Sequence, residues 1–137
     1  MRLTIKHLLT PNFFLWLAVV CSVCIFAGSI ISTNIPPELP FKIGDKIIHS
    51  ISYFILSCLW FLGIFNRIPF DIKKMLLITL LILLYGIIIE VLQEVFTQYR
   101  EADFFDILAN FVGVFIAATL VLIFRKNIFV IKAKNKL

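Results

Sequence analysis

Acidic, imidazole and amide side chains recur at helical spacing in separate stretches of this sequence. Asp45 and His49 are four residues apart, and Asp106 and Asn110 repeat that spacing, so each pair lies on one face of a helix. An imidazole beside a carboxylate can act as a general base, because the carboxylate orients the ring. The same groups are also ligands for divalent cations. The residue types therefore offer two kinds of chemistry, provided that the stretches meet in space.

A third stretch adds an acid and an amide, Glu90 and Gln93, which also share a helical face. Lys46 and Arg100 lie close to these stretches in the sequence. They could bind phosphate or carboxylate groups of a ligand, because charge-assisted hydrogen bonds to such groups are strong. The competing interpretation is that the aspartates only cap helix N-termini, where an anion is favoured. Capping explains Glu90 poorly, because Glu90 falls in the C-terminal part of its predicted helix.

The elements that carry these residues are apolar enough to cross a membrane. The chain has 137 residues, of which 61% are hydrophobic and 15% are charged, whereas soluble domains carry about 25% charged residues. This composition excludes a soluble enzyme and a nucleic-acid-binding domain. Because a membrane helix needs about 20 apolar residues, the sequence predicts an all-α bundle of four transmembrane helices, forming a single domain over residues 1–137. The expected spans lie at about residues 13–32, 46–65, 75–96 and 104–124.

Basic residues are distributed unevenly around these spans. Ten of the 13 fall before the first span, between the second and third, or after the fourth. Short loops rich in Lys and Arg stay in the cytoplasm, so we expect both termini to be cytoplasmic. The polar stretches then lie near the outer ends of the second, third and fourth spans, at matching depth. Because polar groups gather at this one level and do not cross the bilayer, transport is disfavoured.

The ordered polar residues resemble those of VanZ-like membrane proteins. The segment DKIIHSISY over residues 45–53 is similar to the DKxxHxxxY element of that family. A second element, ExxQ…R…DxxxNxxG, is matched by EVLQ over residues 90–93, by Arg100 and by DILANFVG over residues 106–113. Because several ordered positions on three predicted helices agree, the resemblance is more specific than any one short motif.

The resemblance implies a multi-pass protein of the plasma membrane of a bacterium. The founding VanZ protein is associated with low-level resistance to teicoplanin, a glycopeptide that targets peptidoglycan precursors. The implied partners are therefore the lipid bilayer and either a lipid-linked peptidoglycan precursor or a glycopeptide, and no nucleic acid. The resemblance implies no defined reaction, and the ligand and the oligomeric state stay open.

Two classes of function fit these residues. A non-enzymatic envelope protein would bind an envelope ligand in the polar cluster, which we define as Asp45, Lys46, His49, Glu90, Gln93, Arg100, Asp106 and Asn110. An enzyme acting on a lipid-linked substrate would use His49, Glu90 and Asp106, with or without a divalent metal held by these residues and Asp45. No nucleophile motif of the Gly-rich kind supports an enzyme. The non-enzymatic class is therefore preferred, and no cofactor is expected.

Overall fold

The computed structural model describes residues 11–31, 42–96 and 103–129. These residues form helices without any strand: α2 (Pro11–Ile31), α3 (Lys42–Phe65), α4 (Ile72–Phe96) and α5 (Phe104–Phe129). All of them are long and apolar enough to cross a membrane. The predicted all-α fold with four membrane-spanning helices is therefore confirmed.

Each of the four helices extends beyond its predicted span, and α2 begins two residues early, at Pro11. α3 and α4 begin at Lys42 and Ile72, and α5 continues to Phe129, because polar residues can extend a helix past its apolar segment. Asp71 supports the start of α4, since its Oδ1 accepts the backbone N–H of Lys73 at 2.8 Å. The earlier start of α3 places Asp45 inside its first turn.

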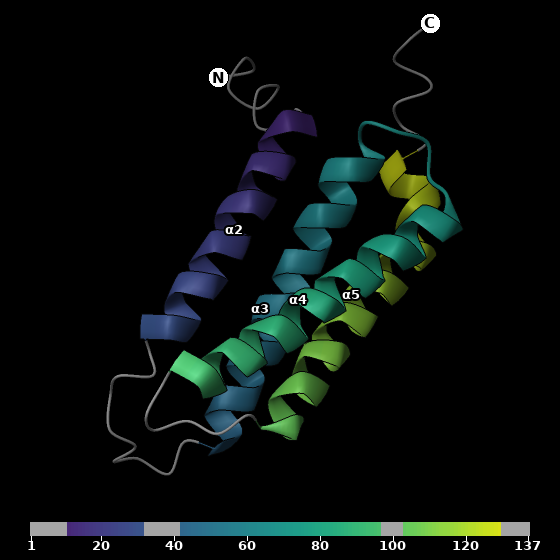
Figure 1. Cartoon of the computed structure of the whole chain (residues 1–137). Coiled ribbons are helices and arrows are strands. Elements are labelled where there is room, and N and C mark those ends of the chain that lie inside the picture. Colours follow the sequence, from purple (N-terminus) through teal and green to yellow (C-terminus); the bar gives the residue numbers. More distant parts are fainter. Residues whose placement is uncertain (1–10, 32–41, 97–102, 130–137) are drawn as a thin grey trace, which may run out of the picture.

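The helices run side by side as a bundle (Figure 1). The start of α2, the end of α5 and the connection between α3 and α4 lie at one end of the bundle. The first turns of α3 and α5 and the last turns of α4 lie at the other end, so that end carries the polar residues. α3 packs most extensively against α5, and α2 lies mainly against α3.

The apolar core lies among α3, α4 and α5. Its largest buried side chains include Tyr53, Leu56 and Phe61 of α3 and Met75 of α4. α2 contributes much less, because Ala18 is the one buried residue among those of α2 whose side chains the structure describes. α2 is therefore a peripheral helix against a three-helix core.

Polar side chains attach α2 to the other helices along its length. The hydroxyl of Tyr85 donates to the carbonyl of Ser22 at 2.5 Å, and Nε2 of Gln93 donates to the carbonyl of Ser29 at 3.2 Å. Near the opposite end, the guanidinium of Arg67 donates to the side chain of Asn12. Individual hydrogen bonds thus supplement the limited apolar packing of α2.

A close approach between α3 and α5 occurs at Gly113. A Cβ atom at this position would lie 2.1 Å from the carbonyl oxygen of Ser50 and 2.9 Å from the amide nitrogen of Phe54. Both contacts are with backbone, so a side chain at residue 113 would force the helices apart. Gly113 therefore permits the spacing that brings the polar first turns of α3 and α5 together.

Candidate functional site

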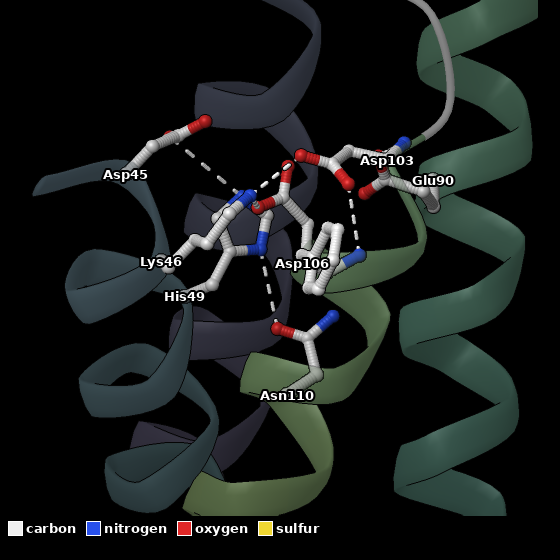
Figure 2. A network of polar contacts seen from close by, with 8 residues as sticks. Asp45, Lys46, His49, Glu90, Asp103, Asp106 and Asn110 are labelled. Atoms are coloured by element: carbon white, nitrogen blue, oxygen red, sulfur yellow. Dashed lines mark hydrogen bonds and ion pairs between the residues drawn. The ribbon is translucent and has the colours of Figure 1, made fainter. Parts of the chain in front are cut away.

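Lys46 joins the first turn of α3 to the start of α5. Its Nζ lies 2.5 Å from Oδ2 of Asp103 and 2.9 Å from Oδ1 of Asp106 (Figure 2). Asp106 is only 1% exposed, and a buried carboxylate is costly unless it is paired and hydrogen-bonded. The ammonium group of Lys46 therefore compensates a buried negative charge and holds the two helices together.

His49 lies one turn further along α3, between an amide and a carboxylate. Its Nδ1 is 3.2 Å from Oδ1 of Asn110, and its Nε2 is 3.9 Å from Oδ1 of Asp45 (Figure 2). Because an amide oxygen can only accept a hydrogen bond, Nδ1 carries the proton in this contact. Nε2 is thereby turned towards Asp45.

Glu90 reaches from α4 to the N-terminus of α5. Its Oε1 accepts the backbone N–H of Asp103 at 3.0 Å, and the residue is 1% exposed. The N-terminal end of a helix attracts negative charge. The unfavourable position of Glu90 near the C-terminal end of its own helix is therefore balanced by the N-terminus of the neighbouring helix.

Helix capping accounts for one of the aspartates in this region. Oδ1 of Asp103 accepts the backbone N–H of Phe105 at 2.8 Å, which is the geometry of an N-cap. Asp45 and Asp106 lie within the first turns of α3 and α5. Their side chains face His49 and Lys46 (Figure 2), so capping alone does not describe their roles.

A cavity of about 400 Å³ between α2 and α3 adjoins these residues. On the α3 side, Asp45 and His49 line it near the start of the helix, and Ile55 lines it about 15 Å further along. Cys21 and Cys24 line it from the middle of α2. The cavity thus has a polar end beside the cluster and an apolar wall towards the middle of the membrane.

Tyr53 lines this cavity, but its hydroxyl oxygen is buried. The residue is 1% exposed, and its hydroxyl has no hydrogen-bond partner among the described residues. A buried hydroxyl without a partner costs about 1–3 kcal/mol. The hydroxyl end of the ring instead packs towards α4, because a Cβ atom at Gly86 would lie 3.2 Å from Cζ of Tyr53.

Most of the residues predicted for the polar cluster come together in the structure. Those gathered at the α3–α5 interface and the end of α4 are Asp45, Lys46, His49, Glu90, Asp106 and Asn110. Gln93 instead binds α2 through Ser29 and lines the cavity. Arg100 lies outside the described residues.

Two residues at this site are absent from the predicted set, Asp103 and Tyr53. Asp103 is three residues before Asp106, so helical spacing could have included it. Tyr53 is the last position of the DKxxHxxxY element, but nothing in the sequence indicates that this residue lines a cavity. For the catalytic alternative, the carboxylate observed beside the His49 ring nitrogen is Asp45, whereas Glu90 binds the backbone of Asp103.

Comparison with known proteins identifies the family of this chain. A family model described as VanZ/LLP1 matches residues 13–125. "Uncharacterized protein C11E3.10" of Schizosaccharomyces pombe is 32% identical over 95 residues, which cover 66% of this chain and 54% of that protein. The chain thus spans about half the length of this relative. No solved structure matches the chain significantly. On the match over residues 13–125, the chain belongs to the VanZ/LLP1 family, as a multi-pass membrane protein.

Proposed function

We propose that this protein binds an amphipathic lipid of the cell envelope, non-enzymatically. The cavity between α2 and α3 carries this proposal, because its walls are polar at one end and apolar towards the middle of the membrane. Ligand sites are typically concave and mostly apolar, with a few polar groups that fix orientation. The head group would lie beside Asp45 and His49, and the hydrocarbon chain would lie along Cys21, Cys24 and Ile55.

The polar groups of the cavity favour a head group rich in hydroxyls. Asp45 and the Nε2 of His49 can accept hydrogen bonds, and the hydroxyl of Ser52 can donate or accept them. Lys46 is already bound by Asp103 and Asp106, so its geometry supports a structural role more than binding of a ligand phosphate. A sugar or glycerol head group matches this set better than an exposed phosphate does.

The family suggests a ligand to test first. The founding VanZ protein is associated with teicoplanin resistance, which supports a lipid-linked peptidoglycan precursor as the ligand and a bacterial plasma membrane as the setting. The relative from fission yeast, an organism that builds no peptidoglycan, favours a wider class of hydroxyl-rich lipids. In this proposal the polar cluster faces the outer leaflet, and the opposite end of the bundle faces the cytoplasm.

Gly28 offers a direct test of the cavity. It lines the cavity, and a Cβ atom built on it meets nothing within 4 Å, so Gly28→Phe would fill the space without a clash at the backbone. We expect the variant to bind a lipid-linked disaccharide precursor or a glycolipid at least tenfold more weakly than the unmodified protein. Native mass spectrometry of the detergent-solubilised protein, titrated with each lipid and with phosphatidylglycerol, would measure this.

Val23→Phe is the matched control, because Val23 lies on the same helix and its side chain is 60% exposed on the outside of the bundle. This variant should bind as the unmodified protein does. Equal binding by the Gly28→Phe protein would show that the lipid lies elsewhere. Absence of binding of every lipid by the unmodified protein would refute the proposed function.

A further inference from the structure

Three side chains at the interface of α3 and α5 present metal-ligand atoms to one another. Asp45 and His49 come from α3 and Asp106 from α5, and one ligand atom from each lies within 4.8 Å of the other two. Asp106 is 57 positions after His49 and 61 after Asp45. The packing of α3 on α5 therefore creates the group. Two carboxylates close to one imidazole form a donor set that suits a divalent cation.

Asn110 orients the imidazole for this role. Its Oδ1 lies 3.2 Å from Nδ1 of His49, so the proton stays on Nδ1 and the lone pair of Nε2 faces Asp45. Metal-binding histidines usually donate their other N–H to an oxygen in this way, which fixes the ring and makes it a better ligand. With the proton on Nδ1, Nε2 lies 3.9 Å from Oδ1 of Asp45, so a cation held between these two atoms would be bound by both.

The surroundings leave access for a cation. Asp45 and His49 line the cavity between α2 and α3, which provides an entry path and room for further ligands such as water. Lys46 binds Asp106 through Oδ1 at 2.9 Å, but a carboxylate has two oxygens and about four lone-pair sites. Asp106 can therefore accept the ammonium group and bind a cation together.

We propose that Asp45, His49 and Asp106 form a binding site for a divalent transition-metal cation, with Mn²⁺ and Zn²⁺ the best matches. Imidazole suits Zn²⁺ and related ions, and carboxylates suit Mn²⁺. Metal–ligand bonds of about 2.0–2.2 Å require the three side chains to close slightly around the ion. Asp45 can move most easily, because its side chain is 39% exposed. This proposal rests on the ligand geometry and does not depend on lipid binding.

The test uses the full chain, purified in detergent and stripped with a chelator. Free Mn²⁺ is followed by electron paramagnetic resonance during titration, and bound Zn²⁺ is measured by elemental analysis after dialysis. We expect one ion per chain, with at least tenfold weaker binding in His49→Ala and in Asp45→Asn. Glu94→Gln, an exposed acid on α4 outside the group, is the control and should bind as the unmodified protein does.

Substitutions of Asn110 test whether it orients His49 for metal binding, because the affinity for the ion should depend on an acceptor at this position. Asn110→Ala removes the acceptor for Nδ1, so the affinity for the ion should fall by about 10–100-fold. Asn110→Asp keeps an acceptor at this position and should restore the affinity.

Two results would overturn the metal site. One is the absence of stoichiometric Mn²⁺ or Zn²⁺ in the unmodified protein. The other is unchanged affinity in both His49→Ala and Asp45→Asn, which would place the ion elsewhere.

Discussion

At the scale of single residues, Glu90 and Asp106 are the buried acids among the described residues. The negative charge of each is compensated by a group from outside its own helix. Asp106 of α5 receives the ammonium group of Lys46 from α3, and Glu90 of α4 receives the backbone N–H of Asp103. A buried hydrogen-bonded charge becomes costly when its partner is removed. These contacts therefore select one arrangement of the helices, whereas the surrounding apolar contacts would tolerate several.

Glu90 allows this to be measured. Glu90→Ala leaves the N–H of Asp103 without this acceptor and removes buried atoms, so the free energy of unfolding should fall by about 1–3 kcal/mol. Glu90→Gln keeps an oxygen that can accept the bond and should lose less. Thermal unfolding of the detergent-solubilised proteins by circular dichroism would report the order. Glu94→Ala, at an exposed position on α4, should be nearly neutral, and an equal loss in all three variants would argue against the specific contact.

At the scale of elements, the spacing of α3 and α5 depends on one glycine. A Cβ atom at Gly113 would meet the backbone of Ser50 at 2.1 Å, and backbone cannot move aside as a flexible side chain can. Gly28 of α2 is the opposite case, because its Cβ position is open. The same substitution should thus have opposite effects at these two positions.

We expect Gly113→Ala to destabilise the bundle by about 1–3 kcal/mol or more, as over-packing does. Gly28→Ala should be neutral or stabilising by up to about 1 kcal/mol, because alanine favours the helix. Melting temperatures of both proteins would test this. A stable Gly113→Ala protein with unchanged Mn²⁺ binding would show that the approach of α3 to α5 is not needed for the site.

Much of this arrangement could be predicted from the sequence. Long apolar segments determine the four helices, and polar residues at helical spacing place Asp45 with His49 and Asp106 with Asn110. The partner of Glu90 could not be predicted, because it depends on how the end of α4 meets the start of α5. The cavity could not be predicted either, because it results from the limited packing of α2 against the other helices. A membrane helix is apolar whether it faces lipid or a neighbouring helix, so the sequence of α2 does not show how closely it is packed.

At the scale of the whole molecule, one end of the bundle is basic and the other holds the buried acids. Among the described residues, the basic end carries Arg67, Lys73, Lys74, Arg125 and Lys126. These lie in and beside the α3–α4 connection and at the end of α5. Basic segments are retained in the cytoplasm, so this polarity predicts the orientation of the protein in its membrane.

Reporter fusions would test the orientation. A fluorescent protein fused after residue 137 should fluoresce, and alkaline phosphatase fused there should be inactive, because both reporters would be cytoplasmic. Phosphatase inserted between α2 and α3 should be active outside. The reverse pattern would place the polar cluster at the cytoplasmic face and would remove outer-leaflet lipids from the list of ligands.

The contact between Glu90 and the start of α5 also affects how the helices are inserted into the membrane during synthesis. Glu90 leaves the ribosome before Asp103 does, so at that moment its acid lacks the amide that later binds it. An acidic residue within an apolar helix resists transfer into lipid. α2 carries no such residue and can enter the bilayer alone. We therefore expect α4 to enter the lipid together with α5, and with α3, whose Lys46 binds Asp106 of α5.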